Sequence, residues 1–128
     1  IALNPDIISH TGNYQATIQA IQIIDKQIER ILKNVLEQNH MLIITADHGN
    51  AESLIDLRSG QIETKHDVNS VPIYLINKNF RKNSSKTKLG ENLPVIGLLS
   101  DIAPTILELM NLPIPKEMTG QSLLSQLL

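Results

Sequence analysis

One long amphipathic pattern, followed directly by a short apolar run, constrains the fold of this chain most strongly. The segment from about Asn13 to Glu37 predicts a single helix, because apolar residues recur there at three- and four-residue spacing. The run from Met41 to Ile44 then predicts a buried parallel strand. The apolar stripe of the helix consists of Ile21, Ile24, Ile28, Ile31 and Val35.

Later segments continue the alternation of strands and helices. Val71 to Ile76 predicts a second strand, and Ile102 to Met110 predicts a helix that Ser100 or Asp101 caps. The leucines of the tail, Thr119 to Leu128, are expected to dock on the core. This order of elements favours an α/β fold with a mostly parallel sheet flanked by helices.

Length and composition exclude several classes of protein. The 128 residues suffice for one compact domain. A net charge of -2 and an aromatic content of 2% argue against nucleic-acid binding. The absence of cysteine excludes disulfides, thiolate metal sites and cysteine nucleophiles. No apolar stretch approaches the ~20 residues that cross a bilayer, so no membrane partner is expected. The chain begins at Ile1 without an initiator Met, and we expect a piece of a longer protein.

The adjacent pair Asp47 and His48 follows the first predicted strand and precedes Gly49. In open α/β folds, ligand sites collect at the carboxyl ends of such strands. A carboxylate oxygen and an imidazole nitrogen presented together there suit a divalent cation. The alternative is that Asp47 caps the next segment and His48 is a polar surface residue.

Further polar residues offer partners for this pair. Asp6 and His10 are four residues apart, which puts both on one side of a helical turn. His66 precedes the second predicted strand, and Asp67 beside it is either a partner that orients an imidazole or a loop residue. His40 ends the long helix and is expected to have a structural role.

Together, two carboxylates and three imidazoles supply most of two neighbouring cation sites. Such sites stabilise the attacking and leaving oxygens in phosphoryl transfer. Oxygen and nitrogen ligands without sulfur suit Mn²⁺ or Zn²⁺. The segment 77–92, which is rich in Lys and Asn, is expected to be a basic surface loop, with phosphate binding as the alternative. The residues of the expected sites are Asp6, His10, Asp47, His48 and His66.

Four motifs in order give the chain a family resemblance. They are NPDIISHTG at 4–12, TADHGNAE at 45–52, DIAPTILELM at 101–110 and EMTG at 117–120. The chain closely resembles the C-terminal end of the cofactor-independent phosphoglycerate mutases, members of the alkaline phosphatase superfamily. The resemblance covers essentially all of residues 1–128, so it implies the C-terminal part of a metal-binding, phosphatase-like domain.

The resemblance implies an isomerase that interconverts 3-phosphoglycerate and 2-phosphoglycerate in glycolysis through a phosphoserine intermediate. It implies two Mn²⁺ ions, although Zn²⁺ or another divalent cation is an alternative. Asp6, His10 and His66 match the family's ligands of one ion, and Asp47 and His48 match those of the other. Asp67 departs from the pattern, since the family usually has Thr or Ser there.

The resemblance also places essential parts of the enzyme outside this sequence. The family's nucleophilic serine lies near its N-terminus, and its substrate-binding domain lies between that serine and the present segment. No nucleophile or substrate-binding residue is therefore assigned, and the isolated chain is expected to be inactive. The alternatives are another metallohydrolase of the same superfamily and a non-catalytic metal-binding module.

The cellular setting is predicted from weaker signals. The sequence is rich in Ile, Asn and Lys, which AT-rich genes favour. This composition favours a plastid (chloroplast) stroma, and a cytoplasmic location is the alternative. The family resemblance implies a monomer when full length, with a small-molecule phosphoglycerate as its partner.

Overall fold

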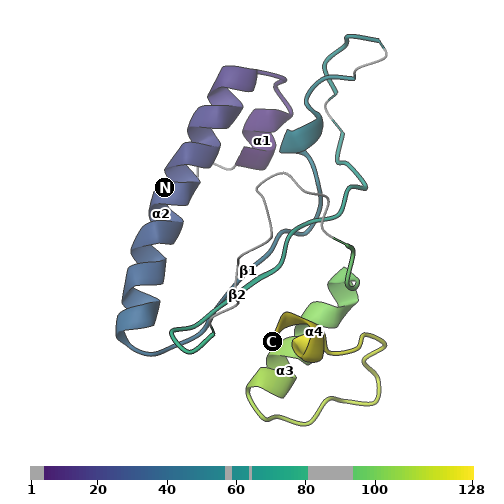
Figure 1. Ribbon diagram of the computed structural model, residues 1–128. Coiled ribbons are helices and arrows are strands. Elements are labelled where there is room, and N and C mark those ends of the chain that lie inside the picture. The colour runs from purple at the N-terminus through teal and green to yellow at the C-terminus, as the bar shows by residue number, and fades with distance from the viewer. Residues whose placement is uncertain (1–4, 57–58, 64, 81–93) are drawn as a thin grey trace. The chain divides into compact units, whose positions relative to one another are not determined.

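The computed structural model describes residues 5–56, 59–63, 65–80 and 94–128 (Figure 1). The chain divides into two compact units, Ile1–Lys78 and Asn79–Leu128, where its length had predicted one compact domain. Among these described residues few large apolar side chains are buried, and the buried hydrophobic residues are Ala20, Leu54 and Leu123. Of the basic segment expected at 77–92, residues 81–92 lie outside the described part of the chain.

Two helices begin the first unit. α1 (Pro5–Ser9) starts with a proline, which costs little at the first helical position. The turn that follows passes through Gly12, whose φ of 66° is the left-handed conformation that glycine adopts without steric cost. α2 (Tyr14–Glu37) begins at Asn13, whose side chain accepts a hydrogen bond from the Ala16 N–H at 3.0 Å. The predicted long helix is therefore confirmed to within a residue at each end.

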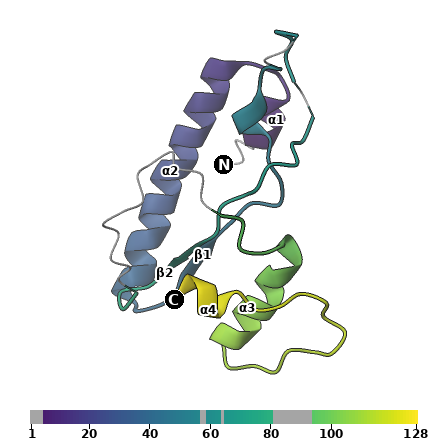
Figure 2. The same cartoon turned by 45° about the vertical axis from the view of Figure 1, so that its right-hand side comes forward.

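The packing of α2 differs in part from the predicted apolar stripe. Thr17 and Ala20 are buried, and α1 packs on α2 (Figures 1 and 2). Small side chains at these positions allow the two helices to approach closely. Ile21 and Ile31 remain exposed in this unit, at 46% and 51%. Periodicity thus predicted the helix correctly, but not which face of it is buried here.

The end of α2 is fixed by its backbone. Asn39 has a φ of 56°, and the His40 N–H reaches back to the Val35 carbonyl at 2.9 Å. The His40 carbonyl in turn accepts a hydrogen bond from the Asn77 side chain at 3.0 Å. Both contacts involve the backbone of His40, so the structural role expected of its imidazole stays a prediction.

The strands β1 (Leu42–Ile44) and β2 (Tyr74–Ile76) pair antiparallel, with Leu42 opposite Ile76 and Ile44 opposite Tyr74. The sequence had predicted a mostly parallel sheet, so that expectation is wrong for this pair. The physical reason lies in the connection, because the described residues between 45 and 73 form no crossover helix. The chain instead returns to the end of β1 that it left, as in a long hairpin.

The connection between the strands is itself folded. It contains the short 3₁₀ helix η1 (Ala51–Ser53) and two isolated bridges, Gly49 with Asp67 and Ile55 with Ile62. The Asp67 N–H donates to the Gly49 carbonyl at 2.7 Å. Because of this bridge, the residue that follows His48 lies beside the residue that follows His66.

The second unit holds η2 (Leu99–Asp101), α3 (Ile102–Leu109) and α4 (Leu124–Leu127). The helix predicted from Ile102 is confirmed, with Asp101 preceding it. The predicted docking of the tail is also confirmed within this unit, because the Leu123 N–H donates to Thr105 Oγ1 at 2.9 Å. Among the described residues, no helix combines the length and apolarity needed to cross a membrane.

Candidate metal centre

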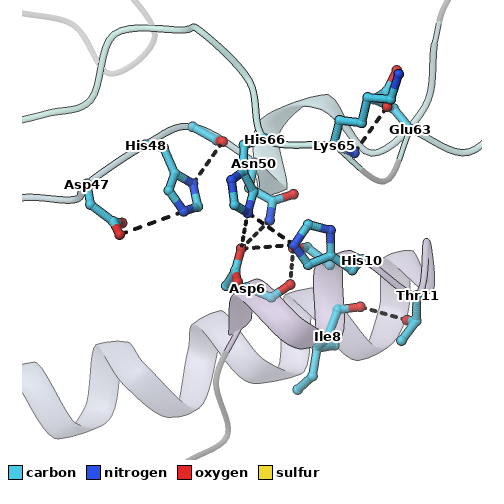
Figure 3. Close-up of polar contacts among 12 residues, drawn as sticks. Asp6, Ile8, His10, Thr11, Asp47, His48, Asn50, Glu63, Lys65 and His66 are labelled. Atoms are coloured by element: carbon cyan, nitrogen blue, oxygen red, sulfur yellow. Dashed lines mark hydrogen bonds and ion pairs between the residues drawn. The ribbon is translucent and has the colours of Figure 1, made fainter.

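Three segments of the first unit meet at one cluster of polar side chains (Figure 3). Asp6 lies on α1 and His10 follows that helix directly. Asp47, His48 and Asn50 lie on the connection just after β1, and His66 lies on the same connection before β2. The contact of α1 with η1 and the bridge between Gly49 and Asp67 bring these segments together.

Asp6, His10 and His66 form a nearly equilateral triangle of ligand atoms. Asp6 Oδ1 lies 3.4 Å from the Nε2 atoms of both His10 and His66, and those two nitrogens are 3.2 Å apart. Two ligand atoms that bind one tetrahedral ion at about 2.0–2.1 Å are separated by about 3.3–3.4 Å. The three atoms are thus spaced like three corners of a metal coordination shell.

His48 lies against this triangle. Its ring stacks on that of His66, with centroids 3.7 Å apart and an interplanar angle of 17°. Single ligand atoms of Asp6, His48 and His66 lie within 4.8 Å of one another. His48 Nδ1 is 3.2 Å from the Gly49 carbonyl, and this contact favours the tautomer in which Nδ1 donates and Nε2 keeps a free lone pair.

Asp47 occupies the outer edge of the cluster. Its Oδ2 lies 3.7 Å from His48 Nε2, and its side chain is 90% exposed. The structure therefore gathers all five residues singled out in the sequence, as one triangle and one adjoining pair (Figure 3). The division that the resemblance implied, with three residues for one ion and two for the other, stays a prediction.

Electrostatics at the centre favour a charged Asp6. The hydrogen bond from the Asn50 side chain lowers the pKa of the Asp6 carboxyl most, and the nearby His10, His66 and His48 lower it further. Desolvation acts in the opposite direction but does not prevail. The lowered pKa favours the carboxylate form of Asp6, which is the form that binds a cation.

Two neighbours of the ligands behave differently from expectation. Asp67 does not act as the orienting partner of an imidazole, since its carboxyl bonds with Ser53 and accepts the Asn69 N–H at 3.0 Å. These bonds lower the pKa of Asp67, the one from Ser53 most. Asn50, to which no role was assigned from the sequence, donates a hydrogen bond to Asp6. Its place two residues after His48 was the only signal.

Comparisons with known proteins agree with this chemistry. A 2,3-bisphosphoglycerate-independent phosphoglycerate mutase of Clostridium kluyveri is 45% identical over 121 residues, which are 94% of this chain and 22% of the relative. The mutase of the same name from Antithamnion sp. is 46% identical over 122 residues, 95% of this chain and 22% of the relative. The chain therefore spans about a fifth of the length of these curated relatives.

A solved structure shares the fold. The crystal structure of Leishmania mexicana phosphoglycerate mutase at low cobalt concentration superimposes with a TM-score of 0.68 at 21% sequence identity. The match covers 92% of this chain and 23% of that one. A family model described as the metalloenzyme superfamily matches residues 2–114. The chain belongs to the metalloenzyme superfamily, and membership implies a domain that binds divalent metal.

Proposed function

We propose that this chain supplies the metal ligands of a 2,3-bisphosphoglycerate-independent phosphoglycerate mutase, which interconverts 3-phosphoglycerate and 2-phosphoglycerate. The observation that carries the proposal is the triangle of Asp6 Oδ1, His10 Nε2 and His66 Nε2, with sides of 3.2–3.4 Å. The names of the similar curated proteins supply the reaction. The nucleophile and the substrate-binding domain are assigned to parts of the enzyme outside these 128 residues.

The proposed roles divide the cluster into two sites. Asp6, His10 and His66 would hold one Mn²⁺, and Asp47 and His48 would contribute to the site of a second. When bound, two such ions would supply positive charge for phosphoryl oxygens and for a nucleophilic hydroxyl oxygen. The residues of this chain support such a site, because single ligand atoms of Asp6, His48 and His66 lie within 4.8 Å of one another.

Activity measurements test the proposal. The full-length protein is expected to isomerise 3-phosphoglycerate in the presence of Mn²⁺ and to lose turnover when Mn²⁺ is chelated. Asp47→Ala or His48→Ala should abolish turnover, whereas Asp25→Ala, at an exposed position on α2, serves as the matched control. The 128-residue chain alone should be inactive, because it lacks the nucleophile.

Three results would contradict this function. Full turnover by Asp47→Ala would remove the second site from the mechanism. Hydrolysis of phosphate esters without any isomerisation would favour a different metallohydrolase of the superfamily. Metal binding without either reaction in the full-length protein would favour a non-catalytic metal-binding module.

The setting of the enzyme is also a proposal. Richness in Ile, Asn and Lys supports a plastid-encoded protein in the stroma, and the family resemblance supports a monomer. Fractionation of the source cells tests the first, with recovery in the cytosolic fraction as the contrary result. Light scattering on the full-length protein tests the second, with the mass of a dimer as the contrary result.

A further inference from the structure

We propose that Asn50 is a positioning residue of the metal centre, which holds Asp6 Oδ1 in place between His10 and His66. This inference rests on the proposed metal-binding function and adds a residue to it. Asn50 Nδ2 donates to Asp6 Oδ1 at 2.6 Å, a contact between segments 44 residues apart in the chain (Figure 3). Asn50 is itself only 7% exposed.

The oxygen that Asn50 contacts is the one that faces both imidazoles. Asp6 Oδ1 lies 3.4 Å from His10 Nε2 and 3.4 Å from His66 Nε2. A carboxylate oxygen has two lone pairs. With the Asn50 amide hydrogen on one of them, the other remains available in the direction of the two nitrogens. The amide thus fixes the rotation of the carboxylate without competing for the position of the cation.

The Asn50 backbone is held by its own loop. Its N–H donates to Glu52 Oε2 at 2.9 Å, and the neighbouring Gly49 carbonyl accepts from the Asp67 N–H at 2.7 Å. A side chain at position 49 would collide with the Glu52 carboxylate. Gly49 therefore lets Glu52 fold back on the loop, and the Asn50 amide reaches Asp6 from a restrained backbone.

Asn50 keeps this arrangement at a cost to the fold. Its Oδ1 is the one buried side-chain polar atom without a hydrogen-bond partner among the residues that the structure describes. A buried carbonyl without a partner is destabilising. A residue retained only for stability is expected to satisfy both ends of its amide. Asn50 satisfies the end that contacts the proposed ligand, which indicates a role in the site.

The two contributions of Asn50 predict opposite effects of one substitution. Asn50→Leu keeps the branched arrangement of four side-chain heavy atoms and removes both the amide donor and the unpartnered carbonyl. The full-length variant, titrated with Mn²⁺ in a calorimeter, is expected to bind one ion about 10- to 100-fold more weakly, as for other residues that orient metal ligands. Its urea unfolding midpoint in the presence of a chelator is expected to equal or exceed that of the unmodified protein.

Matched variants separate positioning from other causes. Asn69→Leu is the control, because Asn69 lies on the same connection but its amide donates to Ser53 and not to Asp6. The Mn²⁺ affinity of this variant should stay within about twofold of that of the unmodified protein. Asn50→Ala is a second variant, for use if Asn50→Leu does not fold. It keeps the backbone N–H that donates a hydrogen bond to Glu52.

Each contrary outcome has a distinct meaning. Unchanged Mn²⁺ affinity in Asn50→Leu and Asn50→Ala would overturn the positioning role. A parallel loss of affinity and of metal-free stability in both variants would show that Asn50 is structural, and would overturn it too. Absence of Mn²⁺ binding by the unmodified protein would overturn the proposed function itself.

Discussion

The imidazole rings of His48 and His66 stack face to face, with centroids 3.7 Å apart, although the two residues are 18 positions apart in the sequence. The bridge between Gly49 and Asp67 brings them together. The stack aligns two nitrogen donors that belong to different proposed ion sites. Because the two rings are in contact, the position of the His48 ring restricts that of the His66 ring, and the two proposed sites are coupled through this stack.

Replacing His66 by phenylalanine separates stacking from metal ligation. His66→Phe keeps an aromatic ring against His48 but removes the Nε2 atom of the triangle. Because a direct ligand is lost, Mn²⁺ affinity of the full-length protein should fall by more than the ~100-fold seen for changes that only orient ligands. Calorimetry with Mn²⁺ measures this loss, and metal-free thermal unfolding should be nearly unchanged. Affinity equal to that of the unmodified protein would remove His66 from the ligand set.

The sequence predicted the members of the centre but not all of their connections. Asp6 and His10 were placed together by helical spacing, and Asp47 and His48 by adjacency, both of which are local properties. The bond from Asn50 to Asp6 joins positions 44 residues apart, and it depends on the bridge between Gly49 and Asp67. Long-range pairing of this kind leaves no periodic signal in one sequence.

The fold shows the same division between local and long-range features. The bounds of α2 follow from the apolar period and from Asn13, so they were predictable. The antiparallel pairing of Leu42 with Ile76 depends on the path of residues 45–73 between the strands. Apolar runs look alike in parallel and antiparallel strands, which is why the direction of pairing was predicted incorrectly.

Removal of the Asn13 side chain should destabilise the start of α2. Asn13→Ala leaves the Ala16 N–H without its acceptor, a loss of about 1 kcal/mol in the free energy of unfolding. Asn13→Asp keeps an acceptor and places a negative charge at the helix N-terminus, so it should preserve stability. Urea denaturation followed by circular dichroism compares the two. Equal destabilisation by both variants would show that the cap is not the cause.

Shortening Leu123 should weaken the docking of the tail in the second unit. Leu123 is 5% exposed and its N–H bonds with Thr105, so Leu123→Ala should cost about 2–3 kcal/mol, the lower part of the range for a buried leucine. Leu128→Ala, at a position 65% exposed, is the control and should change stability by less than about 0.5 kcal/mol. Thermal unfolding gives both values. A control variant as unstable as Leu123→Ala would contradict this packing.

Asp101 should make the stability of the second unit depend on pH. Its Oδ2 accepts the Leu98 N–H and its Oδ1 accepts the Gln121 N–H, each at 2.8 Å. These two bonds, the Leu98 one most, and a weaker one from Ser100 lower the pKa of the Asp101 carboxyl against the effect of desolvation. A folded-state pKa below the unfolded value of about 3.9 means that the carboxylate stabilises the fold above that pH. This stabilisation is lost as the pH falls through the folded-state pKa.

The variant Asp101→Asn tests this dependence with the size of the side chain unchanged. Its amide NH₂ faces a backbone N–H, so one of the two hydrogen bonds is lost at every pH. The unmodified protein should be more stable than the variant at pH 7 and pH 5, and the difference should shrink from about pH 4 downward. Urea unfolding at pH 7, 5, 4 and 3 measures the difference in the free energy of unfolding between the two proteins. The contributions of the other acidic groups are the same in both and cancel in this difference. A difference that stays constant across this range would show that folding does not lower the pKa of the Asp101 carboxyl.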